Sequence, residues 1–178
     1  MNPLRSQTDG SPELTGMRIL VVDDEPSNVA LLEAMLQDAG YSDVKSLTNS
    51  SLVMKTCAAF DPDLVLLDLM MPQPDGFAIL ESLRSTHHEV FLPVIVLTAD
   101  INEESRCRAL AAGATDFLLK PFDQTEVLLR IRNLLDMRTL HLRLDNQRAA
   151  FEDAVYARTS ELKQALAELE QTKACPAG

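Results

Sequence analysis

Five polar residues each close a short apolar run in the sequence, and their types together indicate one kind of chemistry. They are Asp23, Asp24, Asp68, Thr98 and Lys120. Three carboxylates that lie close together repel one another unless a cation lies among them. Oxygen ligands alone suit Mg²⁺ or Mn²⁺ rather than zinc. A lysine and a hydroxyl beside such an ion would bind phosphoryl oxygens, which predicts phosphoryl transfer onto an aspartate, with Asp68 as the nucleophile.

The apolar runs predict the strands that must position these residues. Strands are expected at 18–22, 44–47, 64–67, 94–97 and 116–119, and the segments between them repeat apolar residues at helical spacing, as in 26–39, 50–59, 76–85 and 102–113. Such alternation implies βαβ units and a parallel sheet with both faces covered. We therefore predict an α/β, flavodoxin-like doubly wound sheet of order 2-1-3-4-5, whose strand ends share one crevice.

The segment after Phe122 has a different pattern, and we predict one long helix at 123–173. Asp123 and Glu126 have the spacing of a capping box, and no glycine or proline follows before Pro176. A heptad seam with mostly apolar positions runs through this segment at Leu134, Met137, His141, Leu144, Arg148, Phe151, Val155, Arg158, Leu162, Ala165 and Leu169. This pattern predicts a parallel coiled-coil homodimer. The three polar seam residues leave a solvated or frayed helix as the alternative.

Charge and composition narrow the class of protein. The 178 residues carry 16 Lys+Arg and 27 Asp+Glu, a formal net charge of −11. This balance argues against nucleic acid or an anionic membrane as the main partner of this chain, because both select basic patches. Four aspartates outside the strand ends, Asp38, Asp43, Asp61 and Asp63, are expected to be solvated.

The remaining features indicate a cytoplasmic protein. The three cysteines, Cys57, Cys107 and Cys175, form no C-x-x-C pair, which indicates a reducing compartment without a thiol metal site. No apolar run reaches the length of a membrane span, and the first residues lack the apolar core of a signal peptide. We expect 1–16 to be a disordered leader, 17–122 to be the globular core and 174–178 to be a frayed tail.

Four motifs resemble one known family. VVDDE at 21–25, LLDLMMPQPDG at 66–76, VIVLTAD at 94–100 and GATDFLLKPF at 113–122 are similar to the receiver domain of two-component response regulators. The resemblance extends from residue 17 to about 138. It implies that Asp68 accepts a phosphoryl group from a phosphohistidine of a sensor histidine kinase or phosphotransfer protein, and that the domain is not itself an enzyme.

The resemblance also implies roles for the other site residues. Asp24, Asp68 and the backbone carbonyl of Met70 would ligate Mg²⁺, with Asp23 acting through a water molecule. Thr98 and Lys120 would hold the phosphoryl oxygens. Phe117 occupies the position of the switch aromatic residue, whose rotation accompanies a shift of Thr98, and the peptide bond between Lys120 and Pro121 would be cis.

Two further interpretations concern what the chain does with a phosphoryl group. An aspartyl-phosphate hydrolase acting on a small substrate would also use Mg²⁺, but it needs an acid or base two residues after the nucleophile, where Met70 stands. Residues 157–162 resemble a linker that precedes HD-GYP or GGDEF output domains in related regulators. We therefore expect the signal to pass through a dimeric coiled coil to an output module absent from this chain.

Overall fold

The computed structural model describes residues 16–86, 91–99 and 102–174. Most of the expected leader, Cys175 and the end of the expected frayed tail lie outside these residues. The chain divides into two compact units, Met1–Arg138 and Thr139–Gly178. Each unit is therefore considered by itself below.

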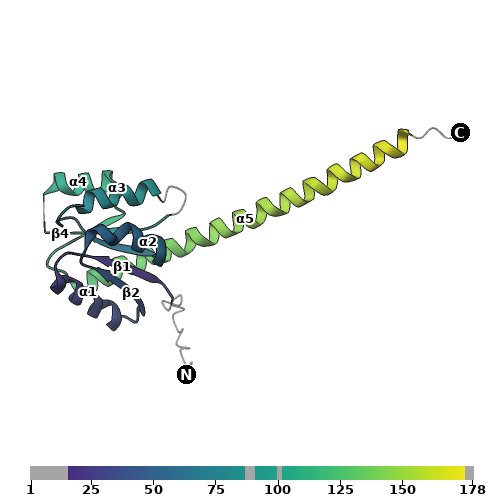
Figure 1. Cartoon of the computed structure of the whole chain (residues 1–178). Coiled ribbons are helices and arrows are strands. Elements are labelled where there is room, and N and C mark those ends of the chain that lie inside the picture. The colour runs from purple at the N-terminus through teal and green to yellow at the C-terminus, as the bar shows by residue number, and fades with distance from the viewer. Residues whose placement is uncertain (1–15, 87–90, 100–101, 175–178) are drawn as a thin grey trace, which may run out of the picture. The chain divides into compact units, whose positions relative to one another are not determined.

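The first unit contains a parallel sheet of five strands (Figure 1). The strands are β1 (Arg18–Val22), β2 (Asp43–Leu47), β3 (Leu64–Asp68), β4 (Val94–Thr98) and β5 (Asp116–Leu119). Their order is β2-β1-β3-β4-β5, which confirms the flavodoxin-like prediction. Every residue of β3 and β4 is buried, as expected for strands covered on both faces, whereas the edge strand β2 is only partly covered.

Four helices connect the strands, and local sequence explains where they begin. They are α1 (Pro26–Asp38), α2 (Val53–Phe60), α3 (Gly76–Thr86) and α4 (Glu103–Ala111). Proline at the first position of α1 has no N–H to leave unpaired, and Gly40 after its end adopts φ +90°. The helix expected from Ser50 begins instead as a 3₁₀ turn at Ser50–Leu52, and the side chain of Asn49 caps it by accepting from Ser51 N at 3.0 Å.

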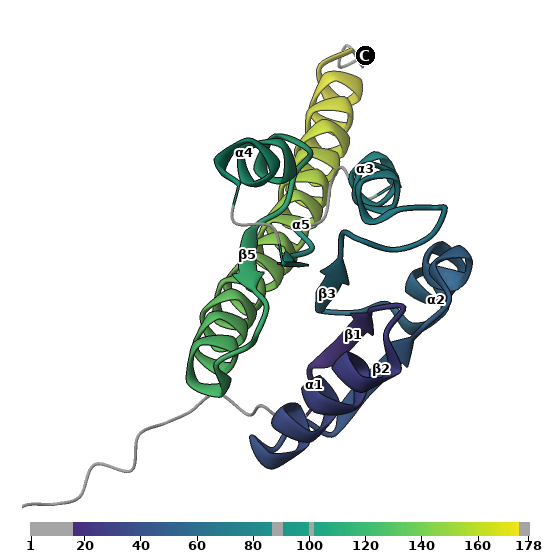
Figure 2. The ribbon, with the colours of Figure 1, turned by 90° about the vertical axis from the view of Figure 1, so that its left-hand side faces the viewer.

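The helices cover the two faces of the sheet as separate layers (Figure 2). Helices α2, α3 and α4 cover one face, where Cys57, Leu80 and Ala109 pack against β1, β3 and β4. Helix α1 and the first turns of α5 (Gln124–Ala174) cover the other face, where Leu36 and Ile131 pack against the same strands. Burial raises the pKa of the Cys57 thiol to about 11, so this side chain is a buried apolar group.

The long final helix is confirmed, with two corrections. Asp123 Oδ1 accepts from the backbone N–H of Glu126 at 2.9 Å, which is one half of the predicted capping box. The Glu126 carboxylate does not form the other half, because it binds Arg130 one turn later, at 2.6 and 2.9 Å. Leu134, predicted as the first seam residue, is 7% exposed and packs in the core of the first unit. Among the seam residues whose side chains the structure describes, Met137 is therefore the first that is exposed to solvent.

Asp63 is not the solvated surface residue that the sequence suggested. It lies at the start of β3 with 6% exposure, and its carboxylate accepts from the backbone N–H of Arg18 at 3.0 Å. The guanidinium of Arg138, 4% exposed in α5, lies 3.8 Å from the same carboxylate and donates to the carbonyl of Phe91 at 2.7 Å. The exposed side chain of Asp61 pairs with Arg18 at 2.8 Å. Asp63 thus neutralises a buried arginine at the end of the first unit.

None of the helices within the described residues combines the length and the apolar character that a bilayer span requires.

Asp63→Ala should destabilise the protein far more than Asp61→Asn. Removing the buried carboxylate leaves the guanidinium of Arg138 without its counter-charge, which should lower the free energy of unfolding by roughly 2–3 kcal/mol. The variant at exposed Asp61 should lose less than about 0.5 kcal/mol, because asparagine tolerates the positive φ of 48° at this position. Urea unfolding monitored by circular dichroism measures both values, and equal losses would contradict the buried pairing.

Candidate functional site

Three carboxylates meet at the carboxyl-terminal edge of the sheet. Asp23 directly follows β1, Asp24 is the next residue, and Asp68 is the last residue of β3, which pairs with β1. One oxygen from each carboxylate lies within 4.8 Å of the others. Asp23 and Asp68 are 0% and 3% exposed, and Asp24 is the most accessible of the three. The predicted convergence of these carboxylates is therefore present.

Lys120 supplies the positive charge of this cluster. It follows β5, and its backbone N–H donates to the carbonyl of Thr98 at 2.9 Å, which fixes its position beside β4. Its Nζ lies 2.7 Å from Asp23 Oδ2 and 3.2 Å from Asp68 Oδ1. The peptide bond between Lys120 and Pro121 is cis, as the resemblance implied. One ammonium group thus bridges two of the three carboxylates.

Asp23 is held in place by three donors. Besides Lys120, the backbone N–H of Glu25 donates to its Oδ1 at 3.0 Å, and the amide of Asn28 donates to both oxygens at 3.1 and 3.2 Å. Asn28 lies in the first turn of α1, so the start of this helix orients the carboxylate. Sequence reasoning missed Asn28, although its place one turn after the acidic pair is a signal that could have found it.

Asp68 has an electrostatic environment that suits a further cation. Burial, and to a lesser degree the charge of Asp23, raises the pKa of Asp68, whereas Lys120 and the backbone amide of Met70 act in the opposite direction. Its Oδ1 is buried, and the described contact to it is the ammonium of Lys120 at 3.2 Å, which also binds Asp23. Buried carboxylate oxygens that share one ammonium group, beside a third carboxylate, match the oxygen ligands that Mg²⁺ prefers.

The loop after Asp68 approaches its backbone so closely that only glycine fits. A Cβ atom on Gly76 would lie 2.2 Å from the carbonyl oxygen of Asp68 and 2.5 Å from Leu69 Cα. The N–H of Gly76 donates to the carbonyl of Leu69 at 3.3 Å, which closes the loop. Gly76 lies in one of the motifs quoted above, but its role depends on a three-dimensional contact that spacing does not reveal.

Thr98 and Phe117 lie on the two strands beside the acidic cluster. Thr98 ends β4 and is 3% exposed. Phe117 is half-buried on β5, where it pairs with Val96, and the guanidinium of Arg106 from α4 lies 4.2 Å from the centre of its ring. This stacking is a cation–π contact that the sequence did not predict.

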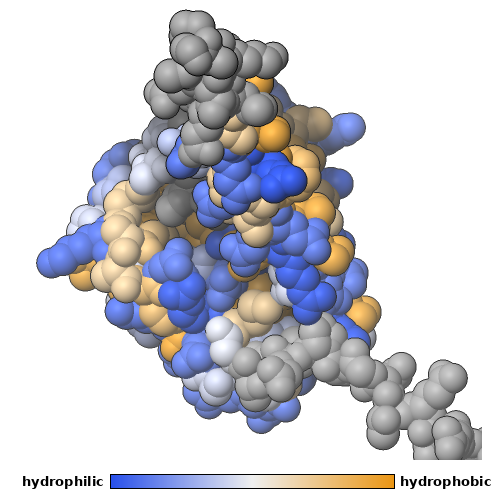
Figure 3. Space-filling view, turned by 90° about the vertical axis from the view of Figure 1, so that its right-hand side faces the viewer, coloured by the Kyte–Doolittle hydropathy of each residue, from blue (hydrophilic) through white to orange (hydrophobic). Residues whose placement is uncertain are grey.

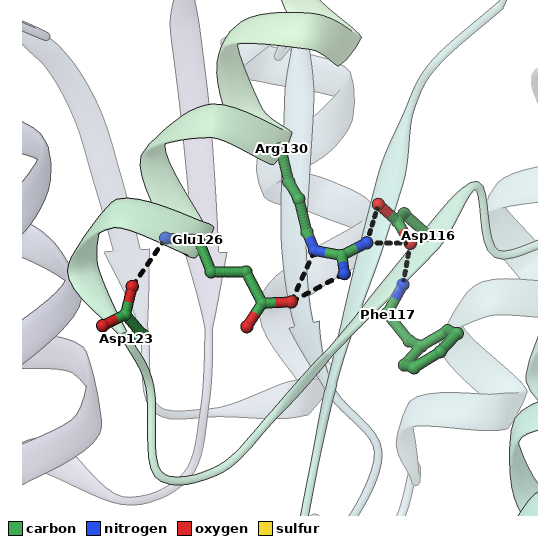
Figure 4. A network of polar contacts seen from close by, with 5 residues as sticks. All are labelled: Asp116, Phe117, Asp123, Glu126 and Arg130. Carbon is green, nitrogen blue, oxygen red and sulfur yellow. Dashed lines mark hydrogen bonds and ion pairs between the residues drawn. The ribbon is translucent and has the colours of Figure 1, made fainter.

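A salt-bridge network fastens the start of α5 to β5 beside Phe117 (Figure 4). Arg130 binds Asp116 at 2.7 and 2.8 Å and Glu126 at 2.6 and 2.9 Å. Asp116 Oδ1 also accepts from the backbone N–H of Phe117 at 2.8 Å. The hydrogen bond to Asp116 is the main reason why the pKa of Arg130 is raised, so this guanidinium remains charged.

Comparisons with known proteins agree with this arrangement. Residues 19–132 match the family described as the response regulator receiver domain. The chain is 38% identical over 118 residues to the DNA-binding dual master transcriptional regulator RpaA of Synechocystis sp. and 40% identical over 117 residues to the response regulator PleD of Caulobacter vibrioides. Each alignment covers 66% of this chain, but only 48% of RpaA and 26% of PleD. The chain therefore spans about half or less of these relatives.

Solved structures show the same fold. Chemotaxis protein CheY4 of Vibrio cholerae aligns with a TM-score of 0.62 and 28% identity, covering 66% of this chain and 98% of that protein. NtrX of Brucella abortus aligns with a TM-score of 0.66 and 29% identity, covering 73% of this chain and 29% of that protein. The likeness to these structures comes from the sheet and the helices that cover it.

Asp68→Asn should stabilise the metal-free chain at neutral pH. Because burial raises the pKa of Asp68, the folded wild type disfavours the charged carboxylate, and its free energy of unfolding falls as the pH rises from the ordinary Asp pKa of about 4 through the raised value. Asparagine does not ionise, so the Asn variant does not lose this stability. The difference in the free energy of unfolding between the variant and the wild type should be largest above the raised pKa of Asp68 and should disappear at acidic pH. Thermal unfolding across pH measures it. Asp43→Asn, at an exposed position, is the control. The same pH dependence of unfolding in both variants would contradict the raised pKa of Asp68.

Gly76→Ala should damage the site more than the fold in general. The added Cβ must push the loop away from the backbone of Asp68, and misplacing a metal ligand commonly weakens metal binding by about tenfold or more. Gly40→Ala is the matched control, because it strains a positive φ but meets no atom within 4 Å. Calorimetric titration with Mg²⁺ should show weaker binding for Gly76→Ala alone, and unchanged binding there would contradict the role assigned to Gly76.

Proposed function

The chain belongs to the response regulator receiver domain family, and on that premise we propose that Asp68 accepts a phosphoryl group from a phosphohistidine of a sensor histidine kinase or phosphotransfer protein. The observation that carries this proposal is the buried Asp68 carboxylate, which lies beside two other carboxylates and 3.2 Å from the ammonium of Lys120. A carboxylate so placed is a nucleophile at the centre of a charged crevice.

The transfer is a displacement at phosphorus. An oxygen of Asp68 forms the new O–P bond while the N–P bond of the phosphohistidine breaks, and the imidazole leaves with the electron pair and takes up a proton. Lys120, already within 3.2 Å of Asp68, balances negative charge on the phosphoryl oxygens. Thr98, at the end of the neighbouring strand, offers a hydroxyl donor to the same oxygens.

We assign the divalent ion to the acidic cluster. Asp24, Asp68 and the backbone carbonyl of Met70 would hold Mg²⁺, with Asp23 acting through water, and Mn²⁺ could take its place. The bound ion supplies charge neutralisation between the carboxylates and the incoming phosphoryl group. Asn28 and Lys120 keep Asp23 oriented toward the cluster.

The signal passes through Thr98 and Phe117 to α5. A hydroxyl drawn toward the phosphoryl group leaves space into which the ring of Phe117 turns, and this rotation breaks the contact with Arg106. Asp116 accepts from the N–H of Phe117 and is bound by Arg130 of α5, so the same strand contacts the helix directly. The pairing of α5 with a second copy then carries the change to an output module.

A hydrolase acting on small substrates is the weaker alternative. Met70, two residues after the nucleophile, is 71% exposed and carries a thioether, which neither donates nor accepts a proton during hydrolysis. Receiver domains are phosphoacceptor signalling domains rather than enzymes in themselves, and the membership of this chain in that family favours the same role here.

Acetyl phosphate with Mg²⁺ should add one phosphoryl group to the wild-type chain and none to Asp68→Asn. Lys120→Met should slow the transfer by roughly 10²-fold, because it removes the charge that balances the phosphoryl oxygens. Intact-mass spectrometry over time measures both, with exposed Asp43→Asn as the control that retains full labelling. A phosphorylated Asp68→Asn chain, or an unlabelled wild type, would contradict the proposal.

A further inference from the structure

The second unit carries an exposed apolar stripe that two arginines interrupt. Leu144, Phe151, Val155 and Leu162 are 61%, 70%, 47% and 56% exposed and recur at alternating spacings of seven and four residues. Within the same seam lie Arg148 and Arg158. Figure 3 shows, on the face that it draws, orange hydrophobic residues at the surface among blue hydrophilic ones. An isolated helix cannot cover such a stripe, so its stability depends on a partner.

Each arginine is neutralised on its own helix. Arg148 Nε lies 2.9 Å from Glu152 Oε1, and a nitrogen of the Arg158 guanidinium lies 2.8 Å from Glu161 Oε2. The glutamates lie at the positions that flank the seam. Because both charges of each pair come from one helix, the stripe has no net charge to repel an identical stripe.

The partner that fits this surface is a second copy of the same helix. A two-fold interface must be self-complementary, and a neutralised stripe with apolar residues at heptad spacing meets that condition. In a parallel, in-register pair, Phe151 and Val155 each meet their own counterpart. The two Arg148 side chains also meet, but their long stems can lie along the apolar surface while their charged ends reach Glu152 and water.

We propose that α5 pairs in parallel and in register with α5 of a second copy, and that Arg148 and Arg158 fix this register. The inference deepens the pairing step of the proposed function and rests on it. A shift of one heptad sets Arg148 and Arg158 of one chain against Val155 and Ala165 of the other. The second chain's Arg148 and Arg158 then meet His141 and Phe151, so three of the four arginines face an apolar residue. In register, the arginines share layers and fewer apolar contacts are lost. Polar seam residues thus weaken the pair while they specify it.

Cysteine cross-linking tests the orientation and the register together. In a full-length chain with Cys107→Ser and Cys175→Ser, Val155→Cys and, in a separate chain, Leu144→Cys should each form a disulfide-linked dimer under mild oxidation. Only parallel, in-register pairing brings both positions against themselves, because an antiparallel pair can do so only near its two-fold axis. Asp153→Cys, which faces away from the seam, is the matched control and should remain monomeric. No dimer from Val155→Cys, or an equal yield from Asp153→Cys, would overturn the proposal.

A mixture of two variants tests the role of the arginines. Val155→Cys chains mixed with Leu162→Cys chains should give no mixed disulfide while the arginines are present. Adding Arg148→Leu and Arg158→Leu to both chains should produce the mixed species, identified by mass, and should tighten the dimer at least about tenfold in ultracentrifugation. Mixed disulfides with the arginines present, or no change without them, would overturn their role in the register.

Measuring phosphate incorporation and cross-linking on the same samples distinguishes a failure of the phosphoacceptor proposal from a failure of the pairing proposal. A chain that gains phosphate at Asp68 but never cross-links at position 155 refutes the pairing and leaves the phosphoacceptor intact. A chain that cross-links in register but gains no phosphate does the reverse.

Discussion

The rest of the site depends on the repulsion among three carboxylates that the sheet brings to one edge. Asp23, Asp24 and Asp68 lie within 4.8 Å of one another, and one lysine lies close to two of them. A single ammonium group cannot balance three carboxylates, and the raised pKa of Asp68 reflects burial that its neighbours do not offset. This excess of negative charge is the reason why we propose a divalent cation beside Lys120 and phosphoryl transfer at Asp68.

Much of the fold followed from the sequence because two periodicities alternate regularly along the chain. The apolar runs predicted all five strands, and the parallel sheet placed their carboxyl ends together, so the acidic cluster and Lys120 could be named in advance. The contacts that hold the site were not predictable in the same way. Asn28 and Gly76 act through hydrogen bonding and close backbone approach, which depend on three-dimensional distances rather than on spacing.

The errors came from residues whose environment is set by distant parts of the chain. Asp63 was expected at the surface, but it is buried because Arg138 of α5 and Arg18 of β1 approach it from elsewhere in the sequence. Leu134 continues the heptad pattern, but it also lies on the face of α5 that packs against the sheet. A local pattern cannot distinguish these two uses of one apolar residue. Arg130 is a further example. It binds Glu126, which therefore does not complete the predicted capping box, and it also binds Asp116 of β5.

Trapping the acyl phosphate tests the central claim most directly. Borohydride reduces an aspartyl phosphate to homoserine, so the modified residue can be read by peptide mass spectrometry after labelling with acetyl phosphate and Mg²⁺. The account predicts homoserine at position 68 and at no other carboxylate of the cluster. Homoserine at Asp23 or Asp24, or phosphate retained only on a residue that borohydride does not reduce, would contradict it.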